Sequence, residues 1–204
     1  VTTRTTASAT IDSGSYATSI ISNDQIVVTA TVPSTFTFSL SGNTDTFTTN
    51  LGTTTVSTSG RTATVATNAA SGWVAWVKST NAALNSVSTG ATIATAGSVD
   101  NTPSDLASVT GYVLDVNYTD SATGTGTVTQ AANFGQEYAG GNNSDTVGGT
   151  AGGALSTSFQ PIAASSGTTD GDSLVLVERA KISAVQAAAT DYTDTLTVVA
   201  AGRF

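Results

Sequence analysis

The chain has 204 residues, a formal net charge of −8 and a charged fraction of only 10%. Its length suits one domain. Its six Lys and Arg residues are scattered singly, so a nucleic-acid surface lacks its electrostatic basis. Without His or Cys, neither Ser-His and Cys-His nucleophile pairs nor imidazole and thiolate metal sites can form. We therefore expect no enzyme, no cofactor and no nucleic-acid partner, and no apolar run is long enough for a membrane span.

The first twelve residues, VTTRTTASATID, place their apolar members at odd positions only. This alternation predicts one extended strand over residues 1–12 with a single apolar face. The face consists of Val1, Thr3, Thr5, Ala7, Ala9 and Ile11. Because the chain starts at Val1 rather than Met, we interpret the start as a processed end, which favours an extracellular or cell-surface location.

The next segments also alternate with a period of two, which predicts strands rather than helices. Residues 25–32 (QIVVTATV) carry a one-sided apolar face, and an even-numbered face continues after Pro33. The even-numbered apolar residues are Ile26, Val28, Ala30 and Val32, followed by Phe36, Phe38 and Leu40.

Residues 61–67 and 71–79 are predicted to form a hairpin around the turn NAASG. Later strands are predicted at residues 111–119, 172–183 and 191–204. This spacing predicts an all-β fold, a β-sandwich or jelly roll with an extended N-terminal strand. We expect residues 13–204 to form a single sandwich domain that contains a Gly-rich loop at 135–153.

Trp73 and Trp76 have opposite parity, so they are predicted to lie on opposite faces of one strand. Lys78 shares the face of Trp76, which marks that face as outward and places Trp73 in the core. An outward Trp76 has three interpretations: a lateral contact between subunits, stacking against a sugar, or burial under a loop of the same chain.

Two sequons, at Asn117 and Asn142, are candidate glycosylation sites if the cell glycosylates Asn. Calcium is the metal that the composition leaves open, because residues 100–105, 142–145 and 170–172 offer oxygen ligands. None of these stretches has EF-hand spacing, and Asp in turns bonds its own backbone. We therefore assign no metal ligand.

Two stretches carry a resemblance: LGTTTVSTSGRTATVATNAASGWVAWVKS and the ending YTDTLTVVAAGRF. They resemble exported β-sandwich surface proteins of small-genome bacteria and, more distantly, WxL-type domains. The spacing W-V-A-W departs from W-x-L, so peptidoglycan attachment is not carried over. The resemblance implies a surface location and no catalytic residues. In design, the chain is also similar to filament subunits joined by donor-strand exchange, such as archaeal threads and camelysin-like fibres.

These observations favour a structural subunit of an extracellular filament or pilus. In this hypothesis the donor strand 1–12 completes the sheet of the next copy, which gives a head-to-tail homopolymer. The alternative is a monomeric or surface-layer adhesin-type domain that binds glycan or protein through Trp76 or the loop 135–153.

Overall fold

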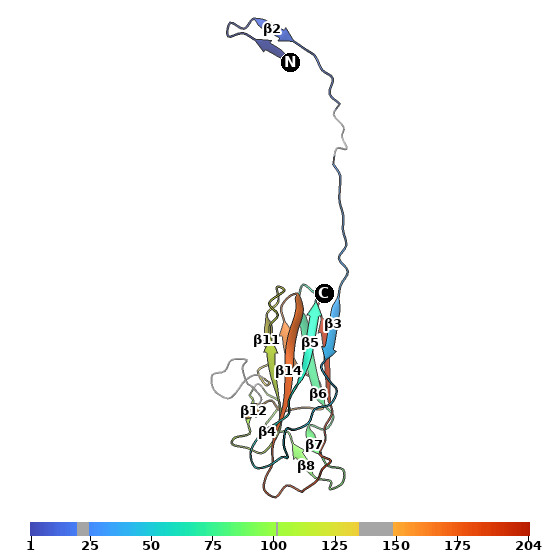
Figure 1. Cartoon of the computed structure of the whole chain (residues 1–204), viewed down its shortest axis with the longest axis vertical. Helices are drawn as coiled ribbons and strands as arrows, with labels where there is room; N and C mark the ends of the chain where they lie inside the picture. The colour runs from blue at the N-terminus through green and yellow to red at the C-terminus, as the bar shows by residue number, and fades with distance from the viewer. Residues whose placement is uncertain (20–24, 101, 135–148) are drawn as a thin grey trace. The chain divides into compact units, whose positions relative to one another are not determined.

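The computed structural model describes residues 1–19, 25–100, 102–134 and 149–204. The chain divides into two units, Val1–Pro33 and Ser34–Phe204. Every regular element among the described residues is a β-strand, which confirms the all-β class (Figure 1). Within these ranges no helix is long and apolar enough to cross a membrane.

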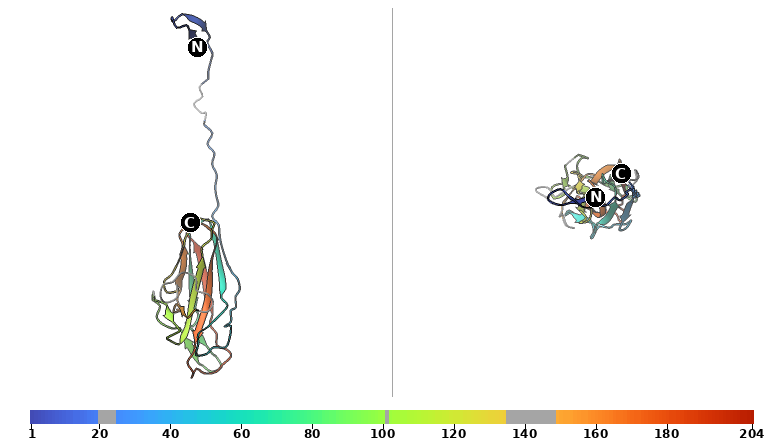
Figure 2. Two further views of the ribbon diagram at one scale, coloured as in Figure 1. Left: turned by 60° about the vertical axis from the view of Figure 1, so that its left-hand side comes forward. Right: turned by 90° about the horizontal axis from the view of Figure 1, so that it is seen from above.

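The second unit is a sandwich of two antiparallel sheets whose strands run along a common long direction (Figures 1 and 2). The first sheet has the order β10 (Gly111–Thr119), β14 (Thr169–Lys181), β5 (Arg61–Thr67) and β3 (Phe36–Leu40), with β4 (Val56–Ser57) beside β14. The second has the order β11 (Val128–Gln130), β13 (Gln160–Ser165), β6 (Trp73–Ser79) and β15 (Leu196–Gly202).

The core fills the space between these sheets because each strand turns alternate side chains inward. In β6, Trp73, Ala75 and Val77 are fully buried, whereas Val74, Trp76 and Lys78 are half-buried on the outer face. The indole Nε1 of Trp73 donates to Asp172 Oδ2 at 2.7 Å, which satisfies the buried N–H. The predicted parity of the two tryptophans is therefore confirmed.

The hairpin predicted over residues 61–79 is wrong. Strand β5 pairs with β3 and β14, whereas β6 pairs with β13 and β15, so the two strands lie in different sheets. The turn between them carries the chain from one layer of the sandwich to the other. Ser71 N–H donates to Arg203 O at 3.2 Å, which ties this turn to the end of β15.

The outer face of the first sheet is covered where β10 and β14 meet. There Arg179 lies fully buried, with its guanidinium 2.9 Å from the carboxylate of Asp115. Val113 packs with Ala96 and Leu106 in a second small apolar cluster. Short strands complete this part of the unit: β7 (Ala83–Asn85), β8 (Thr92–Ala94), β9 (Ser104–Asp105) and β12 (Ala151–Gly152). Asp115 is thus shielded from solvent.

The first unit contains a hairpin in place of the predicted single extended strand. Strand β1 (Thr2–Arg4) pairs antiparallel with β2 (Thr10–Ser13). The turn between them includes Ser8 at φ 64°, and Ser8 N–H donates to Thr5 O at 2.9 Å. Every residue of the hairpin is exposed, so backbone hydrogen bonds rather than a core hold it together. The extended N-terminal strand is therefore not confirmed.

Residues 25–32, predicted to be a strand, pair with no described residue. Their backbone groups join no sheet ladder. Their side chains are almost fully exposed, reaching 91% at Ile26 and 87% at Val28. The predicted alternation is thus present in the sequence, but the described chain supplies no neighbour for it.

Candidate functional site

The sandwich has two edge strands on the same side, β3 in the first sheet and β15 in the second. Each pairs with only one neighbour among the described residues, β3 with β5 and β15 with β6. The two edges approach at the C-terminal end of β15, where a Cβ added at Gly202 would lie 3.1 Å from Phe36 Cδ2. This side of the sandwich therefore combines two open ladders with access to the core.

The hydrogen-bond pattern shows which backbone groups of β15 face outward. Thr80 N–H donates to Thr195 O at 2.9 Å, and Arg203 N–H donates to Gly72 O at 2.7 Å. In an antiparallel ladder, hydrogen-bonded pairs alternate with pairs that are not bonded. The odd-numbered residues of β15 therefore bond to β6, and Leu196 and Val198 direct their N–H and C=O groups to the free edge.

Strand β3 has the same arrangement. Ser41 N–H donates to Thr62 O at 2.8 Å, so the odd-numbered residues bond to β5. The even-numbered Phe36, Phe38 and Leu40 present their backbone groups to the open edge. Phe36 and Phe38 pack only partly against the core, and Leu40 remains 42% exposed. Both edges thus offer unpaired ladder groups at residues whose side chains point inward.

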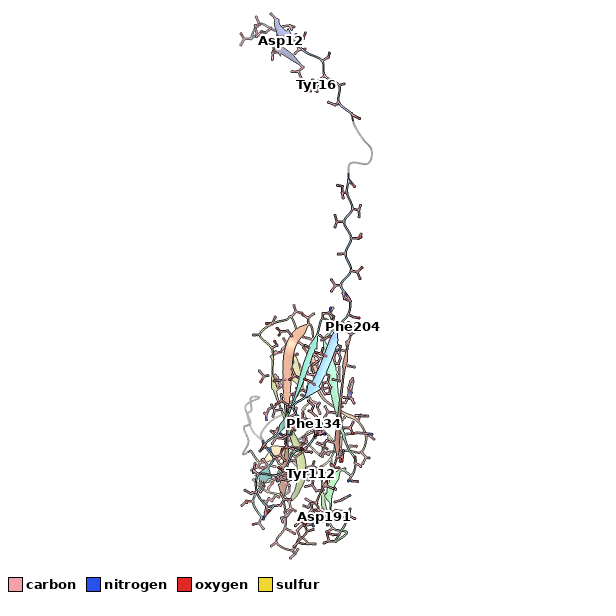
Figure 3. The ribbon with its side chains drawn as sticks, turned by 45° about the vertical axis from the view of Figure 1, so that its right-hand side comes forward. Asp12, Tyr16, Tyr112, Phe134, Asp191 and Phe204 are labelled. Atoms are coloured by element: carbon pink, nitrogen blue, oxygen red, sulfur yellow. The ribbon has the colours of Figure 1, made fainter. Side chains whose placement is uncertain are left out.

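A groove opens between these edges at the end away from Gly202. Its volume is about 520 Å³. We call it the β3/β15 groove. Its lining includes Leu40, Leu196, Val198, Tyr112, Leu176 and Glu178, together with Asp45, Arg61 and Asp194. Tyr112 lies in the half of the sandwich away from the C-terminal Phe204 (Figure 3). The groove is therefore at the opposite end of β3 from the point where Ser34 leads into that strand.

Glu178 is one of three carboxylates that line this groove, with Asp45 and Asp194. Its Oε2 accepts a hydrogen bond from Thr58 Oγ1 at 2.8 Å. Desolvation by burial raises the pKa of Glu178 to about 7, although the hydrogen bond from Thr58 opposes the rise. The nearby Arg61 lies 3.6 Å from Asp45, so its charge is shared with another carboxylate. The side chain of Glu178 therefore changes charge near neutral pH.

Tyr112 lines the groove beside Glu178. Burial raises the pKa of the Tyr112 phenol well above its ordinary value, and the charges of Glu178 and Asp194 raise it further. The phenol therefore stays neutral. With Leu176 and Leu196 it forms the apolar part of the groove, which also has charged side chains in its lining.

The structure places the predicted donor residues in the hairpin of the first unit. Thr3 lies in β1 and pairs with Asp12, while Ile11 lies in β2. Ala7 and Ala9 fall in and beside the turn, and the side chains of Val1 and Ile11 are exposed. The set Val1, Thr3, Thr5, Ala7, Ala9 and Ile11 therefore does not form one strand face. A donor role for it would require the hairpin to open.

Trp76 lies on the outer face of the second sheet, as predicted. Its ladder partners are Pro161 in β13 and Val199 in β15, which makes an apolar row across three strands. Nearby on the sequence, Lys78 Nζ lies 5.1 Å from the ring centroid of Phe159, a cation–π contact. Trp76 is only half-buried, so loops of the chain do not cover it fully.

The remaining predicted sites fall in turns, in a strand or outside the described residues. Asn117 in β10 donates from Nδ2 to Asp115 Oδ2 at 3.1 Å. Asn142 and most of the loop 135–153 lie outside the described residues. The carboxylates of Asp105 and Asp172 accept hydrogen bonds from the chain's own groups. Among the described residues no group of three or more His, Cys, Asp or Glu side chains is placed to hold a metal ion.

Sequence reasoning missed the groove. Glu178 belongs to no motif, and the two edges that form the groove are far apart in the sequence. The even-numbered Phe36 and Phe38, predicted to share a face, pack partly against the core, and so do Leu196 and Val198. No local signal showed that these two strands would be edges.

No family model, curated protein or solved structure matches the chain. The resemblance to exported β-sandwich surface proteins and to filament subunits therefore stays a prediction from the sequence.

Proposed function

We propose that this chain is an extracellular structural subunit that assembles with copies of itself by β-strand addition. The observation that carries the proposal is the segment 25–32, an uncharged, strand-forming stretch whose apolar side chains are exposed and whose backbone is unpaired among the described residues. Such a segment is unstable in water unless it gains a partner.

The energetic argument concerns apolar burial first. Full burial of a Val or Ile side chain contributes about 1.5–3 kcal/mol. Ile26, Val28 and Val32 are each more than 80% exposed, so strand addition would remove most of this surface from water. Association and ordering costs subtract from that gain. Each ladder hydrogen bond then adds about 1 kcal/mol.

The sandwich has edge strands with which such a segment can pair. Within the described part of the chain, its edges β3 and β15 leave ladder groups unpaired and core side chains partly exposed. A copy that both offers a strand and accepts one forms a heterologous contact. Because a heterologous contact need not close into a ring, repetition gives a filament.

The test is the assembly state of the purified full chain. We expect filaments in negatively stained electron micrographs and a concentration-dependent rise in sedimentation coefficient. A protein that stays monomeric at high micromolar concentration, between pH 5 and 8, contradicts the proposal.

A second candidate function is glycan binding at the outer face, favoured by the row formed by Trp76, Pro161 and Val199. In that case Trp76→Ala abolishes binding on a glycan array and leaves the assembly state unchanged. The matched control is Val74→Ala, a half-buried neighbour on the same face.

A further inference from the structure

We propose that the β3/β15 groove is the acceptor for residues 25–32 of a second copy, which pair with the free edge of β15. This inference rests on the proposed function and specifies which surfaces meet. It moves the donor from residues 1–12 to residues 25–32.

The lengths and patterns of the two partners match. The donor has eight residues, and β15 spans seven, Leu196–Gly202. The even-numbered face of the donor is wholly apolar, whereas its odd-numbered face includes Thr29 and Thr31. An added strand that turns its even face inward would cover the half-buried Leu196 and Val198 and leave the two threonines outward.

The backbone groups of β15 point in the direction that this pairing requires. Leu196 and Val198 direct their N–H and C=O groups to the free edge, as the alternation with β6 requires. At the opposite wall, Asp45 Oδ2 is buried and has no hydrogen-bond partner among the described residues. A backbone N–H of the donor could satisfy that acceptor.

The electrostatics disfavour an acidic occupant. Among the described residues that line the groove, the charged side chains are Asp45, Glu178 and Asp194, with Arg61 as the cation. An acidic segment would be repelled by this excess of negative charge. Residues 25–32 carry no charge.

Pro33 disfavours pairing of residues 25–32 with β3 of the same chain. Thr35 N–H donates to Asn68 Oδ1 at 2.8 Å, which holds the start of β3 in line with β5. Residues 25–32 could then fold back onto β3 only through a tight turn at Pro33 and Ser34. The two-residue hairpin turns need positive φ at their first central position, and proline fixes φ near −65°.

The polarity of the unit supports head-to-tail joining. The donor segment leads into β3 at the Phe36 end, and the groove opens at the Leu40 end. The two ends of β3 lie roughly 13 Å apart at the usual rise per residue. The donor segment is therefore joined to the sandwich at one end of β3, and the groove opens at the other end of that strand, as head-to-tail joining needs.

The first experiment compares two charge substitutions in the full chain. Val28→Asp puts a charge on the inward face of the donor, and Thr29→Asp puts the same charge on its outward face. We expect Val28→Asp to raise the concentration needed for assembly at least about 100-fold, because the carboxylate would be buried without a partner. Thr29→Asp should change that concentration less than about 5-fold. Both positions are exposed, so neither change affects folding of the sandwich.

The second experiment uses the absence of natural cysteines. A copy with Val28→Cys is mixed with a copy carrying Val198→Cys and oxidised, and peptide mass spectrometry identifies the pairs. Each copy has one thiol, so a disulfide between positions 28 and 198 must join two molecules. Adjacent strands bring such Cα atoms within the 4.4–6.8 Å that a disulfide needs. Ser158→Cys, an exposed position outside the groove, replaces Val198→Cys in the control.

The outcomes separate the two proposals. Wild-type chain that never assembles overturns the proposed function and this inference with it. Assembly that survives Val28→Asp, or a cysteine at 28 that pairs with 158 as efficiently as with 198, overturns the groove assignment alone. Loss of assembly in Val28→Asp, retained assembly in Thr29→Asp and selective pairing of 28 with 198 support it.

Discussion

The tetrapeptide TATV occurs at residues 29–32 and again at residues 62–65, with opposite fates. In β5 the second copy lies between β3 and β14, and Val65 is fully buried. In the first copy Val32 is 81% exposed, and residues 29–32 have no ladder partner among the described residues. Local strand preference is identical in the two copies. The comparison therefore shows that neighbours, and not the alternating sequence, decide whether such a stretch becomes part of a sheet.

The sharpest way to break this comparison is to place the same charge in both copies. Val65→Asp should destabilise the sandwich by about 4 kcal/mol or more, because it buries an unpaired carboxylate between two sheets. Val32→Asp should change the free energy of unfolding by less than about 0.5 kcal/mol, since the site is exposed. Urea unfolding monitored by circular dichroism measures both values, with Val65→Ala as the control for lost volume.

A large destabilisation by Val32→Asp in dilute, unassembled protein would contradict the assignment of residues 29–32 as an exposed stretch. It would mean that residues 29–32 already pack within their own molecule. At concentrations where the chain assembles, Val32→Asp should instead lower the assembled fraction.

The sequence predicted which side chains turn inward better than it predicted which strands pair. The parity of Trp73 and Trp76 follows from the two-residue period of a strand, because Trp73 is fully buried and Trp76 is half-buried on the other face. The pairing of β5 and β6 was predicted wrongly. A short turn such as NAASG serves a hairpin or a crossing between sheets equally well, and only the distant strands β14 and β15 decide between these outcomes.

The N-terminal hairpin was missed for a different reason. Its turn places Ser8, a residue with no glycine-like freedom, at φ 64°. The residues Thr5, Thr6 and Ala7 give no clear turn signal, so the odd-numbered alternation suggested one strand. The groove depends on tertiary structure altogether, because its walls come from residues near 40 and near 196.

The pH dependence of the free energy of unfolding tests the environment of Glu178 in the β3/β15 groove. The pKa of Glu178 is about 7 in the folded chain, above its ordinary value of 4.5. Between these values the folded state binds more protons than the unfolded state, so stability falls as pH rises. The contribution is fully present below about pH 4.5 and lost as pH rises through 7. We expect a loss of about 3 kcal/mol from this group, because each pKa unit corresponds to about 1.4 kcal/mol.

Glu178→Gln should remove this part of the pH dependence, because glutamine still accepts from Thr58 but carries no charge. Urea unfolding at pH 5 and pH 8 measures the difference between the variant and wild type. That difference isolates Glu178 from the surrounding Asp45, Arg61, Tyr112 and Asp194, which remain in both proteins. If the free energy of unfolding changes equally with pH in the two proteins, Glu178 is not the group responsible. A strand seated in the groove desolvates Glu178 further, so assembly of the wild type should also strengthen at acid pH.

The smallest effect is expected from the hairpin at the start of the chain. Deletion of residues 1–12 removes only exposed side chains and leaves residues 25–32 in place. The free energy of unfolding of the sandwich should therefore change by less than about 0.5 kcal/mol. Calorimetry measures this, and sedimentation measures assembly in the same samples.

If residues 25–32 are the donor, the shortened chain assembles like wild type. If residues 1–12 are the donor, the shortened chain folds and stays monomeric, and Ile11→Asp weakens assembly in the full chain. Val28→Asp in the shortened chain completes the comparison, because it must abolish assembly if the unpaired TATV stretch is where the copies join.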